Sequence, residues 1–387
     1  MKSSRGTAFG LVVAALGLLF WAAIGSTVIR LAFQRDFLNL YTGGVLARTG
    51  HFSDLYDFRL QTAIQDSLVP GLPVHFPFVR PPFYALMLAP LSLLPIQIAF
   101  PVWIGLQTCG MFGVWVWAWR RFGPESMVYC AFFLPASLGI AHGQDCIILL
   151  LEMLAVWLLM ERKLDFVAGL ILGLALFKFH LFLLLPLAIL LRRRWRLLGG
   201  YAVGGTSLAV FSVLLVGEAG VRGYWELLMR KDLISLSPSP EMMVCMNAIA
   251  VNLGIDQIWF RVMLLAIPIG IALWSTWRTE DERRWFWSAV IGSMLLSPHT
   301  FEYDVSSLLI PGLLVAFAGP DKLTRIMGAV VLMPLAYFLT LAGTPWAMAP
   351  SLLVLTFLFA MSGLWPYLST LRSRLASVNE STVSHQR

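Results

Sequence analysis

Long apolar runs alternate with short polar turns along most of the chain. The runs are roughly 17 to 22 residues long, which suits helices that cross a bilayer, and the turns between them carry Lys and Arg. Placing these basic turns in the cytoplasm predicts about twelve crossings with both termini inside. The predicted spans lie near residues 9–29, 98–119, 126–141, 145–160, 165–177, 181–191, 200–216, 257–277, 285–297, 306–319, 326–342 and 349–368.

The segment over residues 82–95 does not fit this alternation. It is apolar enough to enter a bilayer, but four prolines lie within it or next to it, and proline interrupts a continuous helix. If the segment crossed fully, Arg120 and Arg121 would move outside and every later assignment would invert. We therefore predict a re-entrant segment, a segment on the membrane surface, or a kinked span joined to the next.

Two connections between spans are long, over about residues 30–81 and 217–256, and both fall outside the cytoplasm on this map. Apolar residues recur twice at helical spacing in the first connection, which predicts short amphipathic helices at the membrane interface. These positions are Phe37, Leu40, Tyr41 and Val45, followed by Leu60, Ile64 and Leu68. We expect a single membrane domain over residues 1–372 and a polar cytoplasmic tail over residues 373–387.

Composition agrees with an all-α membrane bundle. The chain is 58% hydrophobic and only 13% charged, with a net charge of +7. Most of the Arg residues lie in the short basic turns, as the positive-inside rule expects. The positive charge therefore does not indicate nucleic-acid binding.

Ionisable residues gather at particular span ends, and they are the main indication of function. In a membrane protein such a group costs free energy unless it is paired, hydrated or used. Asp36 opens a predicted interfacial helix next to Arg35. Its carboxylate either caps that helix or acts as a general base facing the bilayer surface. Arg35 either keeps Asp36 ionised or binds an anion.

Two further basic sites lie outside the basic turns. Arg80 precedes Pro81-Pro82, where the chain approaches the membrane again, so its guanidinium either reaches lipid headgroups or neutralises a lipid phosphate. Lys178 and His180 separate two spans without a loop of ordinary length. Because Lys178 violates the positive-inside pattern, it predicts an anion site, and phosphate is the natural anion at a bilayer surface.

A very short turn over residues 142–145 separates two other spans. Gly143 permits the turn after His142, and Gln144 and Asp145 open the next helix. Asp145 either caps that helix or joins Gln144 in hydrogen bonding to substrate hydroxyls.

The late segment over residues 297–304 is dense in ionisable groups for this chain. His299 follows the end of one span, and Glu302, Tyr303 and Asp304 open the next. This density predicts a hydrogen-bonded substrate site. His and carboxylate ligands alone do not establish a metal site, and we predict none.

All of these clusters fall on one extracytoplasmic face of the predicted topology. An enzyme on that face has no ready supply of nucleotide-sugars or ATP. A lipid-carried, phosphate-activated donor would solve this supply problem.

The ordered motifs of the chain resemble those of glycosyltransferase family 87, over about residues 9–345. These are GT-C superfamily membrane enzymes that use polyprenyl-phosphate sugars, typically polyprenyl-phosphate-mannose. The motifs are Arg35-Asp36-Phe37 with Tyr41, the Gly50 to Asp57 stretch ending in Leu-Tyr-Asp, Arg80-Pro-Pro-Phe83 with Ala89-Pro90-Leu91, Gly143-Gln144-Asp145, Ala168-Gly169-Leu170 through Lys178, and Ser297-Pro298-His299 through Tyr303-Asp304.

The resemblance implies a GT-C-type bundle and an inverting transfer of a sugar, with mannose as the typical one, at the outer face of the cytoplasmic membrane. Asp36 resembles the catalytic aspartate of the superfamily's first loop, which as general base takes a proton from the acceptor hydroxyl. Donor phosphate would contact Arg80, Lys178, His180 and His299. Sugar or acceptor would contact Arg35, Tyr41, His142, Gln144, Asp145, Glu302, Tyr303 and Asp304.

The implied partners are a polyprenyl-phosphate sugar donor, a lipid or glycan acceptor and membrane lipids. The resemblance implies no cofactor and no bound metal, and we expect the chain to work as a monomer. A secondary transporter is the main alternative from another class. It would explain the many spans, but such proteins usually show paired repeats and broken helices at the midplane, and here the polar groups lie near span ends.

Overall fold

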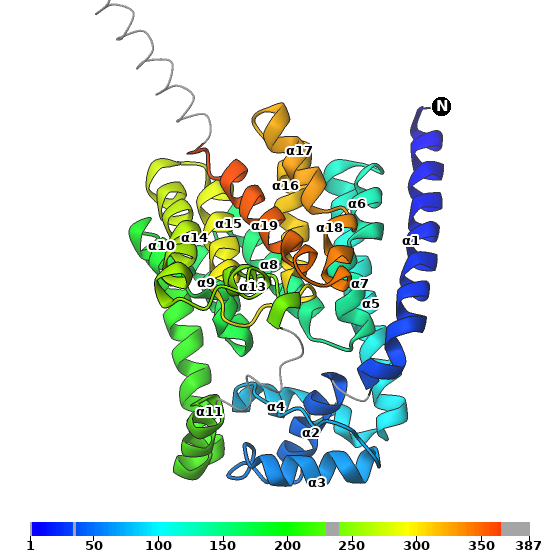
Figure 1. Cartoon of the computed structure of the whole chain (residues 1–387), viewed down its shortest axis with the longest axis vertical. Helices are drawn as coiled ribbons and strands as arrows, with labels where there is room; N and C mark the ends of the chain where they lie inside the picture. The colour runs from blue at the N-terminus through cyan, green and yellow to red at the C-terminus, as the bar shows by residue number, and fades with distance from the viewer. Residues whose placement is uncertain (1, 34–35, 230–239, 365–387) are drawn as a thin grey trace, which may run out of the picture.

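The computed structural model describes residues 2–33, 36–229 and 240–364, and every regular element within these ranges is a helix. Figure 1 shows a large upper body and a smaller lower layer. The upper body and the long helices that flank it comprise α1 (Lys2–Phe33), α5 (Ile96–Phe122), α6 (Ser126–Phe132), α7 (Leu134–Ala141), α8 (Cys146–Glu161), α9 (Asp165–Leu174), η2 (Ala175–Phe182), α10 (Leu185–Leu191), α11 (Trp195–Met229), η3 (Pro240–Met242), α13 (Met246–Asn252), α14 (Ile258–Arg278), α15 (Glu282–Leu296), η4 (Asp304–Leu308), α16 (Leu309–Ala318), α17 (Lys322–Val331), α18 (Leu335–Phe338), η5 (Leu339–Ala342), η6 (Trp346–Met348) and α19 (Ala349–Met361). The lower layer comprises α2 (Asp36–Arg48), α3 (Phe58–Leu68), α4 (Pro82–Leu88) and η1 (Leu91–Leu93).

Five helical stretches of the described chain are long and apolar enough to cross a membrane. They are residues 6–26 of α1, α5, α9 with η2, α11, and α14. A sixth is formed by α17 with α18 and η5, if these two parts, bent by 44°, count as one span. The prediction of an all-helical, multi-pass membrane protein is therefore confirmed. The number of about twelve crossings stays a prediction, because the other apolar runs form shorter helices.

Helix α15 forms the centre of the upper body. Its residues 285–295 are all buried, including Trp285 and Trp287. It packs against α10, α14 and α19. Since α15 is surrounded by protein rather than lipid, its apolar residues face all directions, as expected for a fully enclosed helix.

The long helix α11 connects the two parts of the molecule. In the upper body it packs closely on α9, because a Cβ added at Gly173 would lie 2.9 Å from the backbone of Gly204. At Gly217 the backbone adopts φ +63° and ψ −171°, which breaks the helix one residue after the predicted end of the span at 216. Beyond this break α11 reaches the lower layer, where the rings of Tyr224 and Tyr56 lie 4.5 Å apart.

The lower layer contains the two helices predicted in the first connection. Asp57 caps α3 by accepting hydrogen bonds from the backbone of Arg59 and Leu60. Helix α2 is not amphipathic as expected, because residues on all its sides are buried, and it packs against α1, α3, α4 and η1. Residues 82–95 form the short helix α4 and the turn η1 beside α2, and not a long spanning helix.

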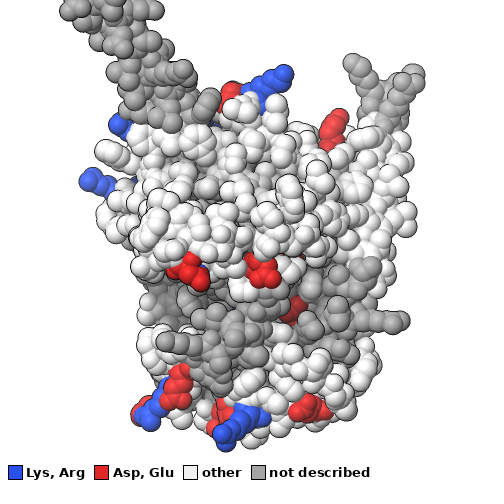
Figure 2. Space-filling view, viewed as in Figure 1, with Lys and Arg blue, Asp and Glu red and all other residues white. Residues whose placement is uncertain are grey.

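Charged side chains appear in three zones of the surface on this side. Figure 2 shows Lys, Arg, Asp and Glu at the upper and lower ends and a few Asp and Glu at mid-height, where the upper body meets the lower layer, while most of the remaining surface is uncharged. Ion pairs join four of the basic turns to one another at a single end. They are Arg121–Glu161 at 3.0 Å, Lys163–Glu282 at 2.9 Å, Arg194–Glu282 at 2.7 Å and Arg194–Asp165 at 2.9 Å. These four basic turns therefore lie at the same end of the molecule.

Candidate functional site

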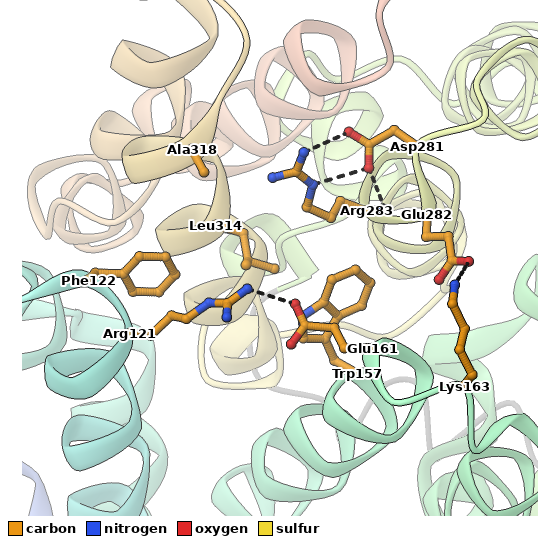
Figure 3. A pocket seen from close by; sticks show the side chains of 10 residues that line it. All are labelled: Arg121, Phe122, Trp157, Glu161, Lys163, Asp281, Glu282, Arg283, Leu314 and Ala318. Carbon is orange, nitrogen blue, oxygen red and sulfur yellow. Dashed lines mark hydrogen bonds and ion pairs between the residues drawn. The ribbon is translucent and has the colours of Figure 1, made fainter.

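The end with the basic turns contains a cavity of about 510 Å³, which Figure 3 shows from close by. Its charged side chains are mainly paired with one another, Arg121 with Glu161 and Arg283 with Asp281 at 3.1 Å. The cavity lies at the far end of α8 from Asp145, about 24 Å away at the helical rise of 1.5 Å per residue. It contains none of the predicted site residues, and we interpret its charges as joining the helix ends.

The predicted site residues meet at the opposite end of α8. Arg80 donates two hydrogen bonds to Asp145, from Nε to Oδ2 at 2.9 Å and from Nη2 to Oδ1 at 3.1 Å. Lys178 Nζ lies 2.7 Å from Asp145 Oδ1 and 2.7 Å from Asp304 Oδ1. Two cations and two carboxylates thus form a charge-balanced cluster from four separate segments of the chain.

Local backbone breaks bring these side chains into position. Gly143 has φ +68°, which lets the chain turn sharply between α7 and α8. Trp103 Nε1 donates a 2.8 Å hydrogen bond to the carbonyl of Gly143 and fixes this turn to α5. Lys178 lies at a non-helical position inside η2, with φ −122° and ψ 48°. The break turns η2 away from a regular helical path at the residue that enters the cluster.

These contacts decide between the two alternatives for Asp145. It stands at the N-cap position of α8 but makes no capping hydrogen bond, because its carboxylate is engaged by Arg80 and Lys178. Lys178 is 1% exposed and bound to two carboxylates, and its contact with a donor phosphate stays a prediction. The sequence could not indicate this pairing, because Lys178 and Asp304 are 126 positions apart.

The charge states of Arg80 and Asp145 follow from these contacts. Burial alone would raise the pKa of Asp145, but the charges of Arg80 and Lys178 hold that pKa well below its usual range. Burial likewise acts to lower the pKa of Arg80, and Asp145 more than offsets it, so the pKa of Arg80 is raised. Both groups therefore stay charged at neutral pH.

Asp36 lies next to this cluster and is paired differently. Asp36 is the first residue of α2, and its Oδ2 lies 2.9 Å from Nδ1 of His142. The two side chains are 22% and 26% exposed, respectively. By contrast, the Asp145 and Asp304 side chains are 0% and 5% exposed. Of these three carboxylates, Asp36 is thus the one that a molecule from outside can reach most easily.

A series of ring contacts leads from the Asp36–His142 pair to the segment over residues 297–304 and on to His180. The centroids of the rings are 5.7 Å apart for His142 and Tyr303, 5.5 Å for Tyr303 and Phe301, and 4.9 Å for Phe301 and His299. His299 and His180 follow at 6.5 Å. We call these five residues the ring row. Tyr303 and His180 are half-buried and His299 is exposed, so the row is accessible above the buried cluster.

The surroundings of the ring row shift its titratable groups. Nearby protein atoms displace part of the water around the His299 imidazole and lower its pKa although the residue keeps an exposed surface, and the charges of Arg80 and Lys178 act in the same direction against Asp304. Burial raises the pKa of Glu302, whose Oε2 has no hydrogen-bond partner among the described residues. The neutral imidazole of His299 donates one hydrogen bond from one ring nitrogen and accepts one at the other.

Some predicted contacts do not reach the site, and one residue was missed. The hydroxyl of Tyr41 donates a 2.7 Å hydrogen bond to the carbonyl of Leu94 next to η1, and the residue is 5% exposed. Gln144 is buried within the 142–145 turn. Arg35 lies outside the described residues. Tyr84, unpredicted, stacks on Phe177 at 4.5 Å near Asp145, and its place after the Arg80-Pro-Pro motif was the available signal.

No group of three or more His, Cys, Asp or Glu residues is arranged to hold a metal ion within the described part of the chain. The site therefore consists of one accessible carboxylate–imidazole pair, an aromatic and histidine-containing row, and a buried ion cluster beneath. Such a set can accept a proton, bind hydroxyl groups and hold an anion.

Comparison with known proteins identifies the family. The model of glycosyltransferase family 87 matches residues 78–298, more than half of the chain. The match includes Arg80, His142, Asp145 and Lys178, whereas Asp36 lies before it and His299 just after it. No curated protein and no solved structure matches the chain significantly. Together with the apolar spanning helices, the family match shows that the chain belongs to glycosyltransferase family 87 and is a membrane glycosyltransferase.

Proposed function

We propose that the chain transfers a sugar, with mannose the first candidate, from a polyprenyl-phosphate donor to a lipid or glycan acceptor, with inversion at the anomeric carbon and with Asp36 as general base. One observation carries the assignment of the base. Of the carboxylates around the site, Asp145 and Asp304 are buried and ion-paired and Glu302 is 7% exposed, whereas the Asp36 side chain is 22% exposed. A general base must come within hydrogen-bond reach of the hydroxyl that it deprotonates.

The chemical step conserves protons and electron pairs. The acceptor hydroxyl gives its proton to Asp36, and its oxygen forms the new bond to the anomeric carbon from the face opposite the phosphate. The bond between that carbon and the phosphate oxygen breaks, and polyprenyl phosphate leaves with the electron pair as an anion. Asp36 then releases the proton to water.

In this proposal the leaving phosphate binds at the end of the ring row formed by His299 and His180, away from Asp36. Arg80 Nη1 is not engaged by a described residue, although Nε and Nη2 bind Asp145, and the side chain is 14% exposed. His180 and His299 lie at the accessible end of the row and supply hydrogen bonds rather than charge. Donors aimed at the developing negative charge stabilise the transition state. Lys178 acts one layer below, as the counterion that keeps Asp145 and Asp304 in place.

The sugar and the acceptor would lie between these two ends, over Tyr303. Sugar rings commonly pack on aromatic faces while their hydroxyls reach polar groups. Glu302 precedes Tyr303 in the chain, and its Oε2 has no hydrogen-bond partner among the described residues. The hydroxyl of Tyr41 is bonded to the carbonyl of Leu94, so this proposal does not use Tyr41.

The orientation in the membrane follows from the same division of charge. The four joined basic turns occupy one end, and the positive-inside rule assigns that end to the cytoplasm. The site at the other end would then face the periplasm or the cell exterior, with residues 1–372 as one domain. A lipid-linked donor suits this face, which has no nucleotide-sugar supply. We propose a monomer, since both ends of the site come from one chain.

The test is a transfer assay in membranes with labelled polyprenyl-phosphate-mannose and extracted lipid acceptors. Wild type should transfer label, and Asp36→Asn should lose transfer by roughly 10²- to 10⁴-fold, the usual contribution of a general base. Asp54→Asn is the matched control, an exposed carboxylate in the same connection. Wild-type-level transfer by well-expressed Asp36→Asn contradicts the base assignment. Transfer from other polyprenyl-phosphate sugars, with none from the mannose donor, contradicts the choice of sugar.

A further inference from the structure

His142 is held in place by contacts on several sides. It ends α7, and its backbone N–H bonds to the carbonyl of Leu138 at 2.8 Å. The following Gly143 is fixed by Trp103, and a Cβ at Gly143 would lie 2.9 Å from Phe37 Cβ. The imidazole ring packs beside Tyr303. The position of the ring relative to α2 is therefore set by packing before any ligand binds.

The same packing brings the imidazole to Asp36. Phe37, next to Asp36 on α2, is fully buried against Phe100 and Trp103, with ring centroids 5.1 and 6.4 Å away. The turn and the first residue of α2 are thus locked together through one apolar contact set. This packing brings His142 Nδ1 within hydrogen-bond distance of Asp36 Oδ2.

We propose that His142 is a positioning residue for the general base, an inference that rests on the proposed function of Asp36. Nδ1–H of the imidazole donates to Oδ2 of Asp36 and fixes the rotation of the carboxylate. Oδ1 is then left in a defined direction to receive the proton of the acceptor hydroxyl. A carboxylate at the first residue of a helix otherwise rotates about its side-chain torsions, and misplacement of a reacting group by about 1 Å can cost on the order of 10²-fold in rate.

The experiment uses three substitutions at one position in the full chain. Asparagine places its side-chain N–H near the site of Nδ1, glutamine places it near the site of Nε2, and alanine removes the donor. With polyprenyl-phosphate-mannose and extracted lipids, His142→Ala should lower kcat by about 10- to 10²-fold with little change in KM, since the loss is one of alignment. His142→Asn should recover most of kcat, and His142→Gln should not.

The matched control is the other short imidazole–carboxylate pair, between His75 Nε2 and Asp66 Oδ1 at 2.7 Å. His75→Ala removes a comparable bond elsewhere in the lower layer and should retain wild-type kcat. Wild-type kcat in His142→Ala, or equal losses in the Asn and Ala variants, overturns the proposal. If Asp36→Asn is inactive in the same series, the general-base assignment survives that result. If Asp36→Asn is fully active, the assignment itself fails.

A second measurement needs no substrate. The chain has six histidines, each with two ring nitrogens, and in protein labelled with ¹⁵N-histidine the pair of ring signals lost in His142→Asn identifies His142. Nδ1 of this residue should be protonated, and its signal should shift in Asp36→Ala. An unprotonated Nδ1, or a signal that does not respond to Asp36→Ala, contradicts the proposed hydrogen bond.

Discussion

Lys178 and Asp304, 126 positions apart in the chain, meet at 2.7 Å with almost no exposed surface on either side chain. Their contact joins the break in η2 to the start of η4. Asp145 completes the arrangement from the start of α8 and passes the connection on to Arg80. The site is therefore built on a buried ion cluster that no single segment could form.

Removing the cation from this cluster should destabilise the protein strongly. Lys178→Met leaves Asp145 and Asp304 buried with one counterion fewer, and breaking a buried pair in this way typically costs about 3–5 kcal/mol. Thermal unfolding of the detergent-solubilised protein measures the effect. Adding Asp304→Asn to Lys178→Met should recover part of the loss, because one buried charge is then removed on each side.

The control for this prediction is Lys163→Met, which removes an ion pair with Glu282 on a side chain that is 72% exposed. Exposed pairs contribute about 0–1 kcal/mol, so the melting temperature should hardly change. Similar losses for Lys163→Met and Lys178→Met would show that the buried cluster has no special weight in stability.

The turn at Gly143 should tolerate no side chain. Gly143→Ala forces a residue with a Cβ to φ +68° and pushes it against Phe37 and Phe100. Such strain costs of order 1–3 kcal/mol, and the displaced turn should reduce transfer activity as well. Gly254→Ala is the matched control, since Gly254 has φ +65° but open space around the added Cβ. It should lose some stability yet keep its activity, and equal activity losses in both variants would contradict the role of the turn.

Stability should depend on the protonation of Glu302. Burial raises the pKa of this carboxyl in the folded state, so the folded protein binds the proton more tightly than the unfolded chain does. The corresponding stabilisation is fully present below the unfolded pKa, about 4.3. It is lost as the pH rises through the folded pKa. Melting temperatures of wild type should therefore fall over this interval relative to those of Glu302→Gln, which does not titrate. Parallel curves for the two proteins would exclude this contribution.

The helices of this protein were largely predictable from local pattern. The break at Gly217, the cap at Asp57 and the failure of residues 82–95 to form a long helix all follow from nearby glycine, aspartate and proline residues. The burial of α2 on all its sides was not predictable, since its apolar positions alone indicate an amphipathic helix. Its remaining sides are covered by α1, α3, α4 and η1 once the lower layer is folded.

Candidate site residues could be named from the sequence, but their partners could not. His142, Asp145, Lys178 and Asp304 stand out as ionisable groups at span ends. Their pairing came only from the structure, in which Asp145 holds two cations and does not cap a helix, and Lys178 is neutralised by two carboxylates. Tyr41 likewise bonds to a backbone carbonyl in η1.

The sequence by itself determined the class of the protein, several helix breaks such as that at Gly217, and the family motifs, because hydrophobic runs, prolines, glycines and basic turns act over a few neighbouring residues. Only the tertiary structure decided which charges are buried in pairs and which carboxylate stays accessible. Those outcomes depend on contacts between segments more than a hundred residues apart, such as Asp36 with His142 and Lys178 with Asp304. The free energy of a charge is set by the groups around it in space.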